Sequence, residues 1–175
     1  REILTFIHGR VPEDLAEFTP LQLKRAGFML ATLHSVTLGF DKEHAEYVVC
    51  HGDASPCNFV FNNQWPIAMI DFDNAFIGRR EIDMGYAAWM WANLGSPSQS
   101  QQHVLSKLLA FAKGYGDFSA KHWISAIIDA QNWLIDKLLE SPESERIQQA
   151  LLWSKDCRAW MEIHRQYFLD HFHLN

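Results

Sequence analysis

The sequence has no long apolar run, few cysteines and no excess of positive charge, and each absence argues against a class of protein. No stretch approaches the roughly 18 apolar residues that a membrane-spanning helix needs. The first ten residues, REILTFIHGR, do not lead from a charged segment into an apolar one and a small-residue cleavage site, so we expect no signal peptide. We therefore expect no membrane as a partner.

The cysteines and the net charge narrow the range of functions further. Three cysteines, Cys50, Cys57 and Cys157, are odd in number and lack the spacing of metal ligands, so we expect neither a disulfide framework nor a zinc site, and the cytoplasm is the expected location. The formal net charge of -6 argues against nucleic acid as a partner, because phosphate binding needs clustered Lys and Arg. Mild acidity suits a cationic substrate, and solubility explains it equally well.

Apolar residues are plentiful and mostly follow helical spacing. The 175 residues are 48% hydrophobic, with 7 Trp and 12 Phe, which is enough for one domain with a full core. Short strands are expected early, over residues 2–8 and 48–50. Helices are expected over residues 20–36, 83–94 with Asp83 as N-cap, 101–115, 119–140 and 143–172. The last is long enough that we expect a kink or a break. The predicted fold class is α+β, mostly helical.

One stretch, residues 48–73, combines a predicted β-hairpin with polar groups at its open end. It reads VVCHGDASPCNFVFNNQWPIAMIDFD, and apolar runs at residues 59–61 and 66–70 flank a polar turn at residues 62–64. His51, Asp53 and Asn58 precede the first strand, and Asp71 and Asp73 follow the second. Closing the hairpin would bring Asn58 and Asp71 to the same end.

Such a patch has the chemistry of a magnesium site. Mg²⁺ prefers oxygen ligands and usually takes one or two carboxylates together with phosphate oxygens, so Asn58 and Asp71 are candidate ligands. Asp53 would then remain to accept a proton from an attacking hydroxyl. The alternative is a coincidental polar hairpin, in which Asp and Asn serve as turn or cap residues.

The order of these residues resembles a known family. The kinase arrangement has a catalytic Asp, then an Asn five residues later, then a short hairpin and a metal-binding Asp. Asp53, Asn58 and Asp71 occur in this order here. Here Gly follows His51, and Asp71 opens the triplet Asp-Phe-Asp. With those changes the stretch resembles the aminoglycoside phosphotransferase and choline kinase family, which shares the protein-kinase fold. The resemblance implies transfer of the γ-phosphoryl group of ATP to a small-molecule hydroxyl, with Asp53 catalytic and Mg²⁺ held by Asn58 and Asp71.

The resemblance also assigns supporting roles. His51 would support the loop from behind, although a purely structural histidine is the alternative. Asp83 would brace the loop backbone, and Asp73 would assist the metal. Ser55 occupies the place where protein kinases keep a Lys. Arg79 and Arg80, between the metal Asp and the next helix, would contact phosphate or pair with nearby acids.

The resemblance covers only the C-terminal lobe of the kinase-like fold. Residues 1–10 would be a hinge strand from a missing N-terminal lobe, with the backbone of Phe6 and Ile7 at the adenine ring. The alternative interpretation of this segment, given equal weight, is an ordinary edge strand. Residues 11–175 would form the lobe. No Gly-rich loop, strand Lys or helix Glu is evident, so we expect a fragment or shortened member that is inactive alone. The alternative is a non-catalytic binding or immunity-type module.

The sequence leaves the acceptor open. A cationic acceptor would favour acids at the cleft, and Asp117, Asp129 and Asp136 are candidates, although each also fits a solvated helix face. An uncovered apolar face would favour self-association of the isolated lobe.

Overall fold

The computed structural model describes residues 6–13, 17–116 and 118–174, and over these the chain is α+β with helices dominant, which confirms the predicted fold class. The helices are α1 Pro20–Val36, α2 Arg80–Ala92, α3 Gln101–Tyr115, α4 Ala120–Leu139 and α5 Glu145–His171. The strands are β1 Val48–Cys50, β2 Phe59–Asn62, β3 Trp65–Met69 and β4 Phe76–Gly78.

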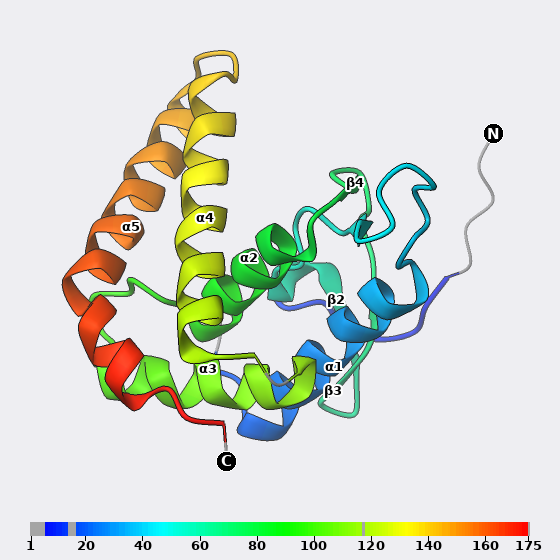
Figure 1. The fold of residues 1–175 in the computed structure, drawn as a ribbon, viewed down its shortest axis with the longest axis horizontal. Coiled ribbons are helices and arrows are strands. Elements are labelled where there is room, and N and C mark those ends of the chain that lie inside the picture. Colours follow the sequence, from blue (N-terminus) through cyan, green and yellow to red (C-terminus); the bar gives the residue numbers. More distant parts are fainter. Residues whose placement is uncertain (1–5, 14–16, 117, 175) are drawn as a thin grey trace.

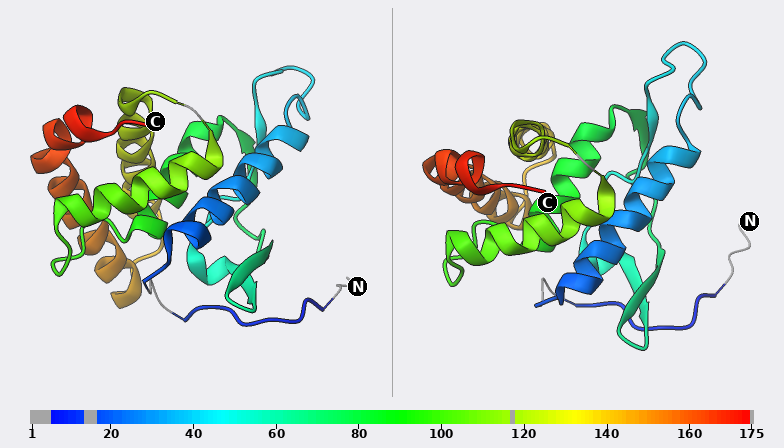
Figure 2. Two further views of the ribbon diagram at one scale, coloured as in Figure 1. Left: turned by 90° about the horizontal axis from the view of Figure 1, so that it is seen from below. Right: turned by 60° about the horizontal axis from the view of Figure 1, so that its bottom comes forward.

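The helices are arranged around α2. It packs against α4 and α3, while α1 packs along α3, and α4 and α5 form a long antiparallel pair at one side of the molecule (Figure 1). The hairpin of β2 and β3 lies beside α1, at the edge away from α5 (Figure 2). None of the helices in the described part of the chain combines the length and the apolar character needed to span a bilayer.

Helix boundaries follow the capping residues of the sequence. Thr19 and Gln22 form a capping box at the start of α1, and Pro20 occupies its first turn. Ser100, Ser119 and Ser144 each accept a backbone N–H at the start of α3, α4 and α5. The helices predicted over residues 20–36 and 101–115 are confirmed, and α4 lies within one residue of its prediction.

The longest helix, α5, is one uninterrupted helix of 27 residues, so the expected break is wrong. It contains neither Gly nor Pro, the residues that most often interrupt a helix. Cys157, Met161 and Phe168 are buried on one side of it, so packing supports its middle and C-terminal turns as one helix.

The predicted hairpin is present, with a tighter turn. β2 and β3 pair antiparallel, with Asn62 opposite Trp65, so the turn consists of Asn63 and Gln64 alone. Both have positive φ, +47° and +71°, as a two-residue type I′ turn requires. The strands therefore begin and end about one residue away from the predicted bounds of 59–61 and 66–70.

A second antiparallel pair, β1 with β4, was not fully predicted. Val48 lies opposite Gly78 and Cys50 opposite Phe76. The sequence predicts β1 but not β4, because three residues give no usable alternation and their partner lies nearly 30 positions away.

The strand predicted over residues 2–8 is not found where the structure can test it. Residues 6–8 belong to no strand, and residues 2–5 lie outside the described part of the chain. The pairing occurs instead at Arg10, whose N–H and C=O exchange hydrogen bonds with Phe61 at 2.8 and 2.7 Å.

The core is dense in aromatic side chains. Trp89, Trp91, Phe111 and Trp123 are almost completely buried at the junction of α2, α3 and α4. Gly85 lets α2 approach α4 closely, because a Cβ there would overlap the carbonyl oxygen of Ala126. Packing at this junction positions α2, whose first turn contains Asp83.

Candidate functional site

A loop of residues 51–58 joins β1 to β2, and Asp83 of α2 holds its start. The backbone N–H groups of His51 and Gly52 donate to Asp83 Oδ2 and Oδ1 at 2.8 and 2.9 Å. Asp83 is 1% exposed. The prediction that Asp83 is the helix N-cap is wrong, because α2 begins at Arg80 and its N-cap is Arg79. Both oxygens of Asp83 serve the loop, so neither caps the helix.

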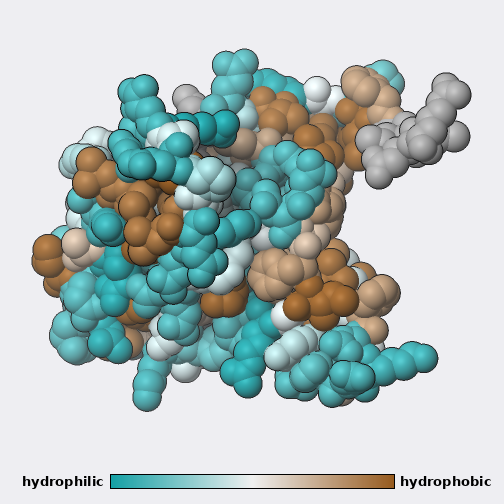
Figure 3. Space-filling view, turned by 90° about the horizontal axis from the view of Figure 1, so that it is seen from above, coloured by the Kyte–Doolittle hydropathy of each residue, from teal (hydrophilic) through white to brown (hydrophobic). Residues whose placement is uncertain are grey.

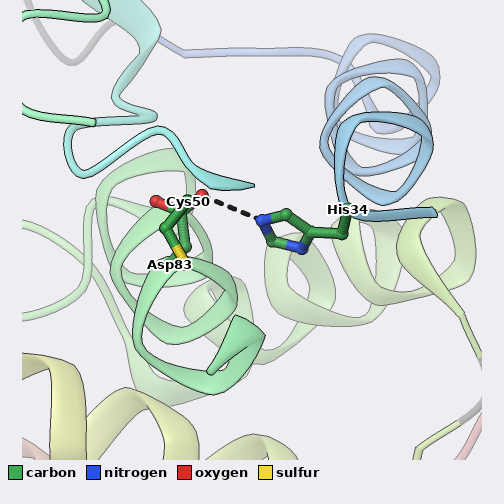
Figure 4. A group of neighbouring side chains, drawn as sticks. All are labelled: His34, Cys50 and Asp83. Carbon is green, nitrogen blue, oxygen red and sulfur yellow. Dashed lines mark hydrogen bonds and ion pairs between the residues drawn. The ribbon is translucent and has the colours of Figure 1, made fainter. Parts of the chain in front are cut away.

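A third donor reaches the same carboxylate from α1. His34 Nε2 lies 2.9 Å from Asp83 Oδ2, and His34 Nδ1 lies 2.6 Å from the hydroxyl oxygen of Tyr115. Figure 4 shows this side chain pointing across the gap between α1 and α2 toward Asp83. His34 is fully buried, and both of its ring nitrogens have a hydrogen-bond partner.

His34, Cys50 and Asp83 place one ligand atom each within 4.8 Å of one another, a spacing that resembles a metal site. The donors do not fit that use. Asp83 already accepts three N–H groups. Burial, followed by the nearby carboxylates of Asp83 and Glu81, raises the pKa of the Cys50 thiol far above its usual range, and metals bind the thiolate. The cluster is therefore a structural brace.

Gly52 brings the loop against the segment that follows β3. Its φ of +77° is in the left-handed region, and a Cβ there would overlap the carbonyl oxygen of Asn74. Only glycine combines that conformation with so close an approach. The loop and the segment that carries Asp71 and Asp73 are thus held side by side.

Asp53, the predicted base, is half-buried and oriented by two neighbours. Its Oδ1 accepts a hydrogen bond from the Tyr86 hydroxyl at 2.9 Å, and its backbone carbonyl accepts one from Asn58 Nδ2 at 2.8 Å. Burial, and then the Asp53 charge and hydrogen bond, raise the pKa of Tyr86 far above its usual range. Tyr86 therefore stays a proton donor to Asp53. No sequence pattern marks Tyr86, because it lies 33 residues away on a helix.

The backbone places Asn58 and Asp71, the two predicted metal ligands, at the same end of the hairpin. The N–H of Ile70, directly before Asp71, donates to the carbonyl oxygen of Asn58 at 3.0 Å. His51 Nε2 donates to the Ile70 carbonyl oxygen at 3.0 Å. Asp71 is exposed and has a φ of +63°, an uncommon conformation for a residue other than glycine.

The remaining predicted residues are placed as follows. Asp73 is exposed beside Asp71, and Ser55 is buried at the start of the turn Pro56–Asn58, where its side chain makes no capping bond. Phe6 and Ile7 are exposed, and the structure assigns them no strand. Arg79 is exposed and Arg80 is half-buried.

A cleft of about 430 Å³ opens beside Asp53. Gly52, Asp53 and Asn74 line one side, and α4 and the start of α5 line the other. Lys137 crosses it: its Nζ donates to Asn74 Oδ1 at 3.0 Å and lies 5.1 Å from the centre of the Trp133 ring. Asp129 and Asp136 do not line this cleft, and Asp117 lies outside the described residues.

Two comparisons with known proteins find similarity, one over nearly the whole chain and one over the region of the loop and the hairpin. The chain is 26% identical over 196 aligned residues to the trifolitoxin immunity protein of Rhizobium leguminosarum bv. trifolii, and the alignment covers 95% of this chain and 74% of that relative. No solved structure matches the chain. The sequence model of the phosphotransferase enzyme family matches residues 40–116, which include the loop, the hairpin and Asp83. The predicted resemblance to this phosphotransferase family is therefore confirmed over residues 40–116.

Proposed function

We propose that the chain is the C-terminal, kinase-like lobe of an ATP-dependent small-molecule phosphotransferase, in which the γ-phosphoryl group of ATP passes to a substrate hydroxyl. The observation that carries the proposal is the position of Asp53. It lies at a cleft, is hydrogen-bonded by Tyr86 and is joined to Asn58 through its backbone. The family match supports phosphotransfer at the level of the family.

Asp53 would act as the base. A carboxylate at the cleft can accept the proton of a hydroxyl as that hydroxyl attacks phosphorus. The Tyr86 hydroxyl occupies Oδ1, which fixes the carboxylate and leaves Oδ2 for the substrate. Positioning of this kind contributes much of the rate in phosphoryl transfer.

Asn58 and Asp71 would hold Mg²⁺, and their chemistry fits the ion. The Asn58 amide nitrogen already donates to the backbone carbonyl oxygen of Asp53. Its amide oxygen is therefore the atom that would bind a metal ion. Asp71 adds an exposed carboxylate at the same end of the hairpin. Amide and carboxylate oxygens are suited to Mg²⁺, which would neutralise charge on the β- and γ-phosphates. Asp73 would support this site.

The other predicted residues would serve the loop and the nucleotide. His51 and Asp83 would hold the loop in place through the contacts described above. Ser55, two residues after Asp53 in the place where protein kinases keep a Lys, is buried and would support the loop. The backbone of Phe6 and Ile7 would meet the adenine ring, as part of a hinge over residues 1–10, with residues 11–175 forming the lobe.

The test is a titration of Mg²⁺ and ATP into the purified chain by calorimetry. Asp71→Ala should weaken magnesium-dependent ATP binding by about tenfold or more. Asp53→Ala should leave ATP binding within about twofold and abolish any ATP hydrolysis. Asp129→Ala, an exposed aspartate on α4 away from the cleft, is the matched control. Equal magnesium-dependent binding by Asp71→Ala and Asp129→Ala would sink the proposal.

The second candidate function is a non-catalytic module that binds or sequesters a toxic compound. It is favoured by one observation, the similarity to a protein named for immunity to trifolitoxin. Such a module has no need of a base, a metal-binding amide and a metal-binding carboxylate together. Undiminished ligand binding in both Asp53→Ala and Asp71→Ala, with no ATP turnover in the parent chain, would favour the module over the phosphotransferase.

A further inference from the structure

The cleft beside Asp53 has a charge pattern that bears on the acceptor. Among the described residues that line it, Asp53 is the one carboxylate, whereas Lys137 and Arg146 each contribute a cation. Lys137 lies on α4 and Arg146 in the first turn of α5, so both cations come from the wall opposite the loop. Setting aside Asp53, the wall that would meet the rest of an acceptor is positively charged.

The same wall is apolar and partly flat. Trp133, Leu134 and Ile147 line the cleft, and Trp133 is partly exposed. The Trp133 ring stacks on Phe76 with centroids 5.8 Å apart, which fixes its plane. Lys137 Nζ lies over that ring. A flat apolar group can therefore pack against Trp133 while a negative group on it reaches the ammonium.

We propose that the acceptor is a hydroxyl compound with a flat apolar part and either no charge or a negative charge, and not a polycation. The inference rests on the proposed function, because it takes Asp53 as the group that receives the hydroxyl. Asp129 and Asp136, the candidate acids for a cationic acceptor, do not support that alternative. Asp129 and Asp136 are exposed and stand outside the cleft.

The physical reason is the balance of charges at short range. A cationic acceptor would meet two like charges and one opposite charge in a partly enclosed space, where each is less screened than in bulk water. An anionic group would instead be attracted by both cations of the wall. The apolar packing on Trp133 is the same in either case, so charge decides between otherwise matched compounds.

Three small alcohols of one shape test the inference on the whole chain. 4-(Hydroxymethyl)benzoate, benzyl alcohol and 4-(hydroxymethyl)benzylammonium differ in charge and share the ring and the hydroxyl. Ligand-observed NMR without nucleotide measures binding down to dissociation constants of about 1 mM and above. We expect the acid to bind about three- to tenfold more tightly than the ammonium compound, with the neutral alcohol between them. Stronger binding of the ammonium compound, or binding of none of the three, overturns the inference.

Matched variants locate the effect. Lys137→Gln and Arg146→Gln should each reduce the preference for the acid by about threefold or more. Lys121→Gln on α4 and Lys155→Gln on α5 remove exposed cations of the same helices away from the cleft and should leave the preference unchanged. Trp133→Leu should weaken all three compounds alike. Equal effects of cleft and control variants would overturn the assignment to this wall.

Anionic oxygens could also come from the phosphates of the nucleotide, and a parallel arm separates the two sources. Titration of ATP with Mg²⁺ into Lys137→Gln and Arg146→Gln should give affinities close to that of the parent chain. If these variants lose nucleotide affinity and keep the preference for the acid, the cations serve phosphate and the assignment of the preference to this wall is wrong. If Asp71→Ala keeps magnesium-dependent ATP binding while the charge order of the three alcohols holds, the proposed phosphotransfer fails and the charge selectivity of the cleft stands.

Discussion

Replacing Asp83 by Ala should destabilise the chain more than any other single change of an acidic residue in the loop region. Asp83 is buried and accepts the N–H groups of His51 and Gly52 and the Nε2 of His34, all at 2.8 to 2.9 Å. Alanine removes the acceptor and leaves three donors in a site closed to solvent. The loop that carries Asp53 would lose its attachment to α2.

The expected cost follows from the donors that are left unpaired. Each buried donor without a partner costs about 1–3 kcal/mol. The cost of burying the carboxylate disappears with the side chain, and water can enter part of the space, so the net change in unfolding free energy should be about 3–5 kcal/mol. Asp83→Asn keeps the volume but turns an NH₂ group toward a donor, and about 2–3 kcal/mol is expected. Either is a large share of the 5–15 kcal/mol, roughly, that stabilises a domain.

The assay is urea unfolding followed by tryptophan fluorescence, combined with amide hydrogen exchange at His51 and Gly52 in Asp83→Asn. Asp129→Ala is the control, since an exposed aspartate on α4 should change the unfolding free energy by no more than about 0.5 kcal/mol. A loss below about 1 kcal/mol in Asp83→Ala, with unchanged protection of both amides in Asp83→Asn, would refute the view that this carboxylate holds the loop.

Three further outcomes are expected. Gly52→Ala should cost about 2 kcal/mol or more, because φ is +77° and the new Cβ would overlap the Asn74 carbonyl oxygen; thermal unfolding measures it, and an unchanged midpoint contradicts it. The hydrogen bond from Lys107 is the largest cause that lowers the pKa of Glu17, so its stabilisation is present above the unfolded pKa near 4.5 and is lost as pH falls through the lowered folded pKa; Glu17→Gln should be a few tenths of a kcal/mol less stable at pH 7, and the difference from the parent chain should vanish once the pH lies below that folded pKa. The apolar surface at Ile67, 41% exposed on β3, is proposed to promote self-association, which Ile67→Lys should reduce in sedimentation velocity; a parent chain that stays monomeric at all concentrations counts against this.

Exposed apolar side chains that could promote self-association are not confined to β3. Figure 3 shows one face of the molecule, on which apolar patches are separated by polar side chains. Trp65, Phe72 and Ile77 are each more than 40% exposed. Exposed apolar patches favour association between copies of a chain.

Local signals predicted the helices and the hairpin well. Thr19, Pro20 and Gln22 mark the start of α1 within four residues of sequence, and Asn63 tolerates the left-handed backbone of the hairpin turn. For Asp83 only the N-cap prediction failed, because an acidic residue near a helix start usually caps that helix; the bracing of the loop backbone that the resemblance implied agrees with its hydrogen bonds to His51 and Gly52. Here its carboxylate is used by a loop more than 30 positions away.

The order of residues in the chain by itself determined that a hairpin would separate Asn58 from Asp71, and that the phosphotransferase family was the one to expect. Those features depend on spacing and on side-chain chemistry, which sequence contains directly. Only the tertiary structure decided that Tyr86 would orient Asp53 and that Lys137 and Arg146 would line the same cleft. Helices far apart in the chain supply these groups, and their meeting depends on how α2, α4 and α5 pack, which no local pattern encodes.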